Sequence, residues 1–386
     1  MTKTIVKEKI ALFHPWIKSR GGAEKVVLEL ANLKNFDVDI YTWVYEPDKT
    51  FEEFKKLNVK VIAPKFARKF SRSYLLRGLF FFASLFSKIP LEEYDKFLIS
   101  TSGVGEFITF RNYKKGKTYA YIHTPLREAT PEIVKWNLEN KYSHKTLKKL
   151  IYLLFVKIYL SFEKLAWKKL DVLIFNSELS ELRARNRNLM GKQKECVVYP
   201  PIELDRLNKI KKQKGNQFVY ISRLNPPKRQ DLLIEAWKRF SKKKKGYELL
   251  LVGNTENKEY YEQLLKISKG DKSIKILTDV KTKELEEILG RAKAGIFLGY
   301  QEDFGIVPLE ILAAGKPLFA VDEGGYVNLI KNNPLFHKIK EKHSRVEMID
   351  EIEKGLFEFD KKIFKWREKI VLKDFKNEME KILKNE

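Results

Sequence analysis

The chain has 386 residues, 44% hydrophobic and 33% charged, so it is long enough for two globular domains and too apolar to be disordered. A single cysteine, Cys196, excludes a disulfide framework and favours a reducing compartment. No run of about 18 apolar residues is present and the N-terminus lacks a signal-peptide pattern, which predicts a cytoplasmic protein that does not span a membrane.

The formal net charge of +25 has three explanations, which are a lysine-rich proteome, attraction to anionic lipid and binding to nucleic acid. Lysine and arginine are spread over the whole length without a concentrated nucleic-acid motif. We therefore expect no nucleic-acid partner, while the first two explanations stay open.

Strand-like apolar runs alternate with amphipathic stretches, which is the pattern of α/β domains with parallel sheets. The expected strands are residues 9–15, 38–44, 96–101, 118–123 and 172–177 in the first half, and 217–222, 247–253, 274–280, 294–299 and 317–322 in the second. This pattern predicts two doubly wound, Rossmann-like domains that face each other across a cleft, where a ligand would bind.

Tandem Pro200-Pro201 suits a stiff linker, because proline cannot continue a strand ladder. The predicted N-terminal domain covers residues 1–199, and the predicted C-terminal domain covers residues 200–358. The remaining stretch, 359–386, is amphipathic and is expected to form a helix that packs back on the N-terminal domain.

Two short patterns in the first half suggest ligand chemistry, and each has a structural alternative. Gly21 and Gly22 lie between a strand and a helix, where backbone can approach a phosphate closely, although such a pair is more often an ordinary turn. Asp37 and Asp39 spell the D-x-D of some metal-dependent sugar transferases. They alternate at strand period, however, which predicts a solvated strand and no metal site.

The segment 65–88 is basic and rich in aromatic residues, and it contains no acidic residue. It fits an amphipathic stretch that lies on an anionic bilayer. It fits equally well a pair of core helices with a solvated basic face. Both interpretations stay open.

Residues 121–132, YIHTPLREATPE, end a strand at His123, and Arg127 follows in the next turn. Taken alone, a histidine at a strand end is more often structural than catalytic. Further on, Ser177 ends a strand directly before a helix, where its hydroxyl is expected to cap that helix.

In the second half, residues 221–237 read ISRLNPPKRQDLLIEAW and place Arg223 and Lys228 after a strand. Two cations at this position can neutralise a leaving diphosphate through charge-assisted contacts. In so basic a chain, such a pair is more often a solvated surface.

The stretch YQEDFGIVPLEILAAGKP, 300–317, predicts a turn followed by a helix that Gly315 ends. The first amides of that helix have no intrahelical partner and form a predicted phosphate site. The residues of this site are Asp303, Phe304, Gly305, Ile306 and Val307.

Two carboxylates flank this turn. Glu310, expected in the first turn of the helix, is suited to hold a ribose diol, and Glu302 is suited to reach a second polyol. From spacing alone, the alternative of a helix-stabilising Glu310 and a solvated Glu302 has equal weight.

The order E-D-F-G-I-V-P-L-E-x5-G-K-P closely resembles the E-x7-E motif of the retaining glycosyltransferase family 4, whose members have the GT-B fold. Residues 221–237 resemble the family's G-R-L-x-x-x-K-G-x-D-x-L-I-x-A segment, and residues 277–289 match its next unit. The H-T-P-L-R run is similar to the H-x-P segment of mannosyltransferases of bacterial polysaccharide assembly. Ser222 and Asn328 stand where many members carry Gly and Glu.

In the C-terminal domain, the resemblance implies that Glu310 holds the ribose of a nucleotide sugar and Glu302 the transferred sugar. It places Arg223 and Lys228 on the donor diphosphate, so that no metal and no other cofactor is needed. The backbone around Val280 would face the nucleobase.

In the N-terminal domain, the resemblance implies that the loop at Gly21 and Gly22 faces the donor. His123 would contact the donor sugar near its reacting carbon, and Arg127 would assist on the acceptor side.

The predicted function is retaining transfer of a hexose, with mannose favoured, from GDP-mannose or a UDP-hexose to an oligosaccharide or lipid-linked acceptor. The enzyme would be cytoplasmic or peripheral on the cytoplasmic face of the membrane. A GT-B nucleotide-sugar epimerase or a phosphorylase is the alternative enzyme. A basic nucleic-acid-binding protein would explain the charge but not the paired glutamates.

Overall fold

The structure is a computed structural model that describes residues 7–64, 86–141, 146–255, 257–342, 344–362, 364 and 372–384. Two compact units make up the chain: Met1–Pro201 together with Lys373–Glu386, and Ile202–Leu372. The segment 65–88, predicted as either lipid-binding or core, lies outside the described residues except for its last three.

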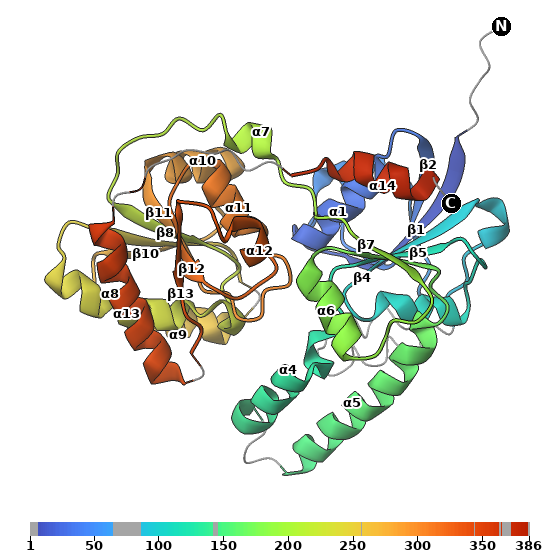
Figure 1. The fold of residues 1–386 in the computed structure, drawn as a ribbon, viewed down its shortest axis with the longest axis horizontal. Coiled ribbons are helices and arrows are strands. Elements are labelled where there is room, and N and C mark those ends of the chain that lie inside the picture. Colours follow the sequence, from blue (N-terminus) through green and yellow to red (C-terminus); the bar gives the residue numbers. More distant parts are fainter. Residues whose placement is uncertain are drawn as a thin grey trace, which may run out of the picture. The chain divides into compact units, whose positions relative to one another are not determined.

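The first unit contains a parallel sheet with the strand order β3-β2-β1-β4-β5-β6-β7 (Figure 1). Its strands are β1 (Glu8–Ile17), β2 (Phe36–Tyr45), β3 (Val59–Val61), β4 (Lys96–Thr101), β5 (Thr118–Ile122), β6 (Val172–Phe175) and β7 (Lys194–Val197). Its helices are α1 (Gly22–Ala31), α4 (Pro131–Trp136), α5 (Thr146–Trp167), α6 (Glu178–Asn186) and α14 (Phe375–Lys384), with a π-helical turn at Asn137–Lys141 and 3₁₀ turns at Glu52–Lys56, Leu91–Glu93, Gly105–Phe110 and Arg127–Ala129.

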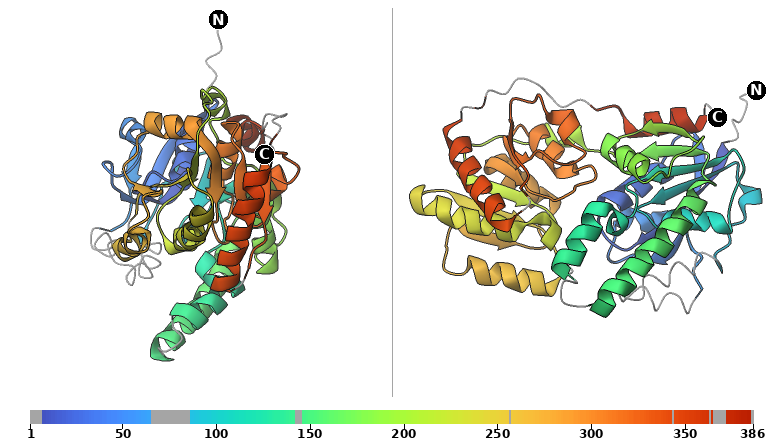
Figure 2. Two further views of the ribbon diagram at one scale, coloured as in Figure 1. Left: turned by 90° about the vertical axis from the view of Figure 1, so that its left-hand side faces the viewer. Right: turned by 60° about the horizontal axis from the view of Figure 1, so that its bottom comes forward.

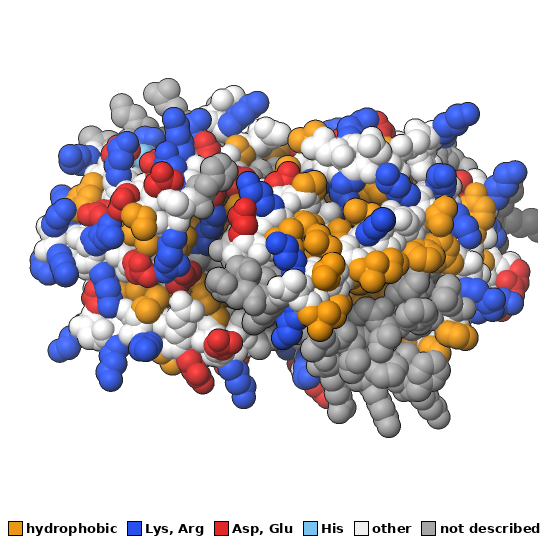
Figure 3. Space-filling view, turned by 90° about the horizontal axis from the view of Figure 1, so that it is seen from below, with side chains coloured by type: hydrophobic (Ala, Val, Ile, Leu, Met, Phe, Trp, Pro, Cys, Tyr) orange, Lys and Arg blue, Asp and Glu red, His pale blue; other side chains and the backbone are white. Residues whose placement is uncertain are grey.

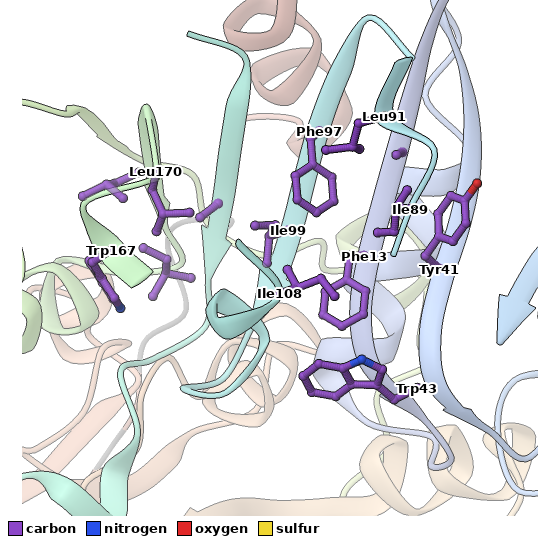
Figure 4. Packing of buried hydrophobic residues seen from close by; sticks show 14 of the residues in the cluster. Phe13, Tyr41, Trp43, Ile89, Leu91, Phe97, Ile99, Ile108, Trp167 and Leu170 are labelled. Atoms are coloured by element: carbon purple, nitrogen blue, oxygen red, sulfur yellow. The ribbon is translucent and has the colours of Figure 1, made fainter. Parts of the chain in front are cut away.

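Successive side chains of the central strands enter two different cores, because neighbouring residues of a strand point to opposite faces. Phe13 and Ile99 pack on one face with Trp43, whose ring centroid lies 5.0 Å from that of Phe13 (Figure 4). Leu12 and Leu98 enter the core of the other face. The strands are thus apolar throughout, as expected of a parallel sheet covered on both sides.

The second unit contains a parallel sheet with the order β10-β9-β8-β11-β12-β13. Its strands are β8 (Gln217–Ile221), β9 (Glu248–Val252), β10 (Ile274–Leu277), β11 (Ala292–Phe297), β12 (Leu318–Val321) and β13 (Phe336–Ile339). Its helices are α7 (Leu204–Leu207), α8 (Gln230–Lys243), α9 (Lys258–Ser268), α10 (Thr282–Arg291), α11 (Ile306–Ala313), α12 (Val327–Ile330) and α13 (Arg345–Lys361), with a 3₁₀ turn at Pro226–Lys228. Both strand orders confirm the prediction of doubly wound, Rossmann-like units.

The C-terminal stretch differs from the single helix predicted over 359–386. Residues 359–361 end α13 in the second unit, where Phe359 packs 5.8 Å from Phe218 between ring centroids. In α14, by contrast, Phe375, Met379 and Leu383 recur once per turn and enter a core of the first unit. The apolar periodicity is continuous across both pieces, so sequence alone did not separate them.

Helices α4 and α5 project from the first unit, away from its sheet (Figures 1 and 2). Only the C-terminal part of α5 is well packed, with Tyr159, Ala166 and Trp167 buried. Within the described ranges, no helix combines the length and apolar character needed to cross a bilayer.

Candidate active site

The order of the second sheet reverses between β8 and β11, which are hydrogen-bonded neighbours. At such a switch point the loops after the two strands diverge and leave a ligand-binding crevice at the carboxyl edge. The loop after β8 carries Arg223 and Lys228, and the loop after β11 carries Glu302. The fold therefore brings together residues that lie more than seventy positions apart in the sequence.

Lys228 and Glu302 contact each other directly. The Lys228 Nζ lies 2.5 Å from Glu302 Oε2, and the side chains are 13% and 21% exposed. The same ammonium lies 5.1 Å from the centroid of the Phe297 ring, which adds a cation–π contact. Each predicted catalytic residue thus holds the other in place.

An arginine that sequence reasoning missed fixes this loop. Arg229 donates two hydrogen bonds to the Glu341 carboxylate, at 2.6 and 2.5 Å, and its guanidinium lies 4.5 Å from the Tyr300 ring centroid. The Tyr300 N–H donates to the Pro227 carbonyl at 2.8 Å. These contacts join the loop after β8 to the loops after β11 and β13. The only signal for Arg229 in the sequence was that it directly follows Lys228.

The residue directly before α11 is a glycine that no other residue could replace without strain. Gly305 has φ 85°, in the left-handed region, and a Cβ there would lie 2.5 Å from the Tyr326 ring. The amides of Ile306 and Val307 then open the helix without intrahelical partners. Phe304 points into the core, so only its backbone is suited to a ligand, and Asp303 is half-buried.

Glu310 lies in the second turn of α11, not in the first turn as predicted. Burial raises the pKa of its carboxyl, Arg206 lowers it and Glu203 raises it further. Among the described residues, no side chain or backbone group hydrogen-bonds to this carboxylate. The guanidinium of Arg223, which is exposed, likewise has no side-chain partner in the described part of the chain. The Glu310 carboxylate and the Arg223 guanidinium are therefore both available to form hydrogen bonds with a ligand.

The loop at Val280, predicted to face a nucleobase, is stabilised by two hydrogen bonds at the neighbouring Asp279. Asn254 donates to Asp279 Oδ1 at 3.0 Å and accepts from the Asp279 N–H at 2.7 Å. Asp279 has φ 56°, a conformation that asparagine and aspartate tolerate best among non-glycine residues. The half-buried Val280 packs against the core beneath it.

In the first unit, His123 follows β5 and belongs to a buried cluster. Its Nε2 lies 2.9 Å from the Ser100 Oγ, and the His14 Nδ1 lies 3.0 Å from the same oxygen and 3.1 Å from the Ser100 carbonyl oxygen. His14 and Ser100 come from β1 and β4, on either side of the switch point of this sheet. Sequence reasoning missed both, although each lies near the carboxyl end of a strand that it located.

The hydrogen bonds limit where the protons of this cluster lie. A carbonyl oxygen only accepts, so the His14 Nδ1 carries a proton. The Ser100 hydroxyl shares a hydrogen bond with His123 Nε2 in which either group can donate. Among the described residues, the other ring nitrogen of His123, Nδ1, has no hydrogen-bond partner. It is therefore available to a ligand.

Burial keeps both histidines neutral. It lowers the pKa of His14 to about 4 and, with His14 as a second cause, that of His123 to about 3, from 6.5. Between these values and 6.5 the unfolded chain binds protons that the folded chain does not, so stability falls as pH falls. We expect a loss of about 1.4 kcal/mol per pH unit for each histidine below about pH 6.

Urea unfolding measured at several pH values between about 7.5 and 5 checks this expectation. His14→Asn keeps a donor for the Ser100 carbonyl but does not titrate. As the pH falls, the unfolding free energy of this variant should therefore decrease less steeply than that of the wild type. The difference in slope should be about 1.4 kcal/mol per pH unit, which corresponds to one proton. Equal slopes for the variant and the wild type would contradict the burial of a neutral His14.

The Gly21-Gly22 turn serves a carboxylate of the chain itself. Gly21 precedes α1 and Gly22 begins it, as predicted from the sequence. The Ser19 hydroxyl donates to Glu24 Oε1 at 2.6 Å, and a Cβ on Gly21 would lie 2.6 Å from Glu24 Oε2. The missing side chain thus makes room for the buried Glu24, a constraint that the sequence pattern did not reveal.

Arg127 begins a 3₁₀ turn. The residue before it, Leu126, is hydrogen-bonded to another part of the same unit. The Leu126 carbonyl accepts from Arg187 Nη1 at 3.0 Å, and Arg187 also pairs with the buried Glu163 of α5. Tyr159 of α5 donates to the Gly103 carbonyl in the loop after β4. Helix α5 therefore supports two loops at the carboxyl edge of the first sheet.

Two structural predictions are confirmed, a helix cap at Ser177 and a strand at Asp37 and Asp39. The Ser177 Oγ accepts from the Ser180 N–H at 3.2 Å and caps α6. Asp37 and Asp39 lie in β2, where Asp39 pairs with Lys60 at 2.8 Å and accepts from Tyr94 at 2.6 Å. No three His, Cys, Asp or Glu side chains in the described part of the chain are grouped to hold a metal ion.

Comparison with known proteins shows what parts of this chain are similar to. Residues 202–363 match the family described as glycosyl transferases group 1. The chain is 26% identical over 371 residues to the alpha-1,3/1,6-mannosyltransferase ALG2 of Kluyveromyces lactis, covering 83% of this chain and 70% of that protein. It is 31% identical over 215 residues to the GDP-Man:Man(3)GlcNAc(2)-PP-Dol alpha-1,2-mannosyltransferase of Candida glabrata, covering 50% of this chain and 41% of that protein.

Among solved structures, HepE of Anabaena in complex with UDP aligns with a TM-score of 0.61 at 17% identity, covering 91% of this chain and 90% of that one. This likeness supports the fold alone. Both sequence relatives are named as transferases, so the comparisons do not favour the epimerase or phosphorylase alternative.

Proposed function

We propose that this chain transfers mannose from GDP-mannose to a lipid-linked oligosaccharide. The proposal starts from a glycosyltransferase with the GT-B fold, whose residues 202–363 match the family described as glycosyl transferases group 1. Transfer would retain the configuration of the anomeric carbon. The donor class and the acceptor class are supported by the names of the two relatives, which are a GDP-mannose enzyme acting on a PP-Dol oligosaccharide and a second mannosyltransferase.

One observation supports the proposal most strongly. Several groups that can hydrogen-bond but have no partner among the described residues lie together at the carboxyl edge of the second sheet. Arg223 and Glu310 have no side-chain hydrogen-bond partner among the described residues, and α11 begins with open amides. A cation, two amides and a carboxylate match a diphosphate and a ribose diol in chemistry. A purely structural surface has no need for this combination.

The proposed reaction uses the groups of this site as follows. Arg223, Lys228 and the α11 amides stabilise the negative charge that grows on the leaving diphosphate. A leaving-phosphate oxygen takes the proton of the acceptor hydroxyl on the same face of the sugar. Glu310 holds the ribose, and Glu302 binds hydroxyls of the transferred mannose. The backbone at Val280 borders the nucleobase.

The first unit supplies the other groups that the proposal needs. His123 contacts the donor sugar near its reacting carbon, and the Gly21-Gly22 loop borders the donor. Arg127 acts on the acceptor side. The single cysteine, Cys196, supports a reducing compartment, and we propose that the reaction takes place at the cytoplasmic face of a membrane.

A panel of nucleotide sugars tests the donor assignment. GDP-mannose, UDP-glucose and ADP-glucose are added separately, and the unfolding temperature is measured. A ligand at about a hundredfold above its Kd stabilises the folded state by about 2.7 kcal/mol. We expect the largest shift with GDP-mannose. Stabilisation by UDP-glucose alone would overturn the mannosyl assignment.

Transfer itself is tested with a synthetic lipid-linked oligosaccharide and labelled GDP-mannose. An α-linked product from the α-configured donor is expected, with the configuration read by NMR. Release of an epimerised nucleotide sugar without an acceptor would instead indicate an epimerase. A β-linked product would contradict retention.

We expect transfer to be independent of divalent metal, because Arg223, Lys228 and helix amides supply the positive charge that a metal would bring. Initial rates are measured after dialysis against a chelator and again after Mn²⁺ is added back. Unchanged rates are the expected result. Full loss of activity in the chelator with recovery in Mn²⁺ would overturn this part of the proposal.

A further inference from the structure

Helix α5 carries an unusual number of exposed apolar side chains. Leu147 is 71% exposed, Leu150 60% and Leu154 58%. The full set of exposed large apolar residues on this helix is Leu147, Leu150, Ile151, Leu153, Leu154, Phe155, Ile158, Phe162 and Leu165. A contiguous apolar face of this kind marks an interaction site on a folded protein.

In the C-terminal half of the helix, the opposite side is packed against the first unit. Val156, Tyr159 and Ala166 are buried in a small core with Phe107 and Ala129. Apart from Leu153, the exposed apolar residues recur at intervals of three and four, so they form a stripe along one side of the helix. The stripe therefore begins on the projecting N-terminal part of the helix and continues onto the part that is docked on the first unit.

The charges around this stripe have one sign. Lys148, Lys149, Lys157, Lys164 and Lys168 are exposed on or directly after α5. The only acidic residue of the helix, Glu163, is buried and paired with Arg187. Figure 3 shows a band of hydrophobic side chains on the face seen from below, with Lys and Arg side chains scattered over that face.

This combination selects one kind of partner. A second copy of the chain would bring its own lysines against these lysines, and no exposed acid on α5 would compensate them. An anionic bilayer offers both an apolar interior for the leucines and negative headgroups for the lysines. The helix is not suited to span the bilayer, so it would lie along its surface.

We propose that α5 lies in the plane of an anionic membrane, with its leucine stripe in the acyl boundary and its lysines at the headgroups. This surface is distinct from the segment 65–88, which the sequence singled out. The inference rests on α5 alone, so it does not depend on the proposed donor or acceptor. Because α5 also supports the Gly103 and Leu126 loops, membrane binding would set these loops close to the lipid.

Vesicle sedimentation of the full chain tests this proposal. Binding is measured to phosphatidylcholine vesicles with and without phosphatidylglycerol. The test variant combines Leu147→Asn, Leu150→Asn and Leu154→Asn. The matched control combines Leu182→Asn, Leu265→Asn and Val346→Asn, which are exposed apolar residues of α6, α9 and α13. Exposed positions of this kind leave the fold intact, and circular dichroism checks this.

The wild type and the control variant should bind the phosphatidylglycerol vesicles, and added salt should weaken that binding. The α5 variant should lose at least about a hundredfold in affinity for these vesicles. Burying even one leucine side chain strengthens binding by tenfold or more, and the variant removes three. Absence of wild-type binding, or equal binding by the α5 variant, would overturn the proposal. So would a wild-type dimer in solution that only the α5 variant converts to monomer, since a second copy would then cover the stripe.

Discussion

Lys228→Ala should lower the kcat of transfer by about 10²–10³-fold, the usual effect of removing one preorganised charge that stabilises a transition state. The lysine lies after β8 at the switch point of the second sheet, and its ammonium is held by Glu302 and by the face of Phe297. This position is fixed before a donor arrives, so the cation needs no rearrangement as charge develops. Initial rates at saturating donor and acceptor measure the effect.

Removing Lys228 also leaves the half-buried Glu302 without its ion pair, at a cost of about 1–3 kcal/mol in stability. Rates are therefore measured well below the unfolding temperature of the variant. Lys228→Arg keeps the charge and should retain part of the activity that Lys228→Ala loses. Lys242→Ala removes an exposed lysine of α8 and serves as the matched control. Wild-type activity in Lys228→Ala would contradict the catalytic role.

The sequence predicted the central strands well because parallel strands covered on both faces are continuous apolar runs. The strands it missed are β3, β7 and β13, which are all edges of their sheets. An edge strand is partly solvated and carries no continuous apolar signal; the four residues of β7 read KECV. Solvation thus hid three of the four edge strands, whereas the edge strand β10 was located from the run 274–280.

The residues of the candidate site were also predicted in part only. Residues in a contiguous motif, such as Glu302 and Gly305, were located from order and spacing. The Lys228–Glu302 ion pair and the Arg229–Glu341 pair join positions far apart in the chain, and no local pattern encodes such a pair. His14 was missed for the same reason, since its role depends on the neighbouring strand β4.

The second unit combines two kinds of charged group at its carboxyl edge. Lys228, Glu302, Arg229 and Glu341 are paired with one another and hold the loops in shape. Arg223 and Glu310 have no such partner among the described residues. Paired charges stabilise a fold, whereas a half-buried charge without a partner costs free energy. The free energy of a bound ligand must offset that cost, which is why Glu310 is the more informative residue to change.

Glu310→Ala should weaken donor binding by about 10²–10³-fold, because two hydrogen bonds from ribose hydroxyls to a charged acceptor are lost. The same change should leave the empty enzyme as stable as the wild type or more stable near pH 7. Burial raises the pKa of this carboxyl, so the ionised form is disfavoured in the folded state. Its destabilising effect is absent at low pH and grows as pH rises through the folded-state pKa.

Calorimetric titration with GDP-mannose and urea unfolding of the empty protein measure the two quantities separately. Glu284→Ala removes an exposed glutamate from the first turn of α10 and is the matched control, with neither quantity expected to change. A structural glutamate predicts the opposite pair of results, in which stability falls and donor affinity is kept. Loss of affinity together with equal or higher stability can arise only if Glu310 is held for a ligand at the expense of the fold.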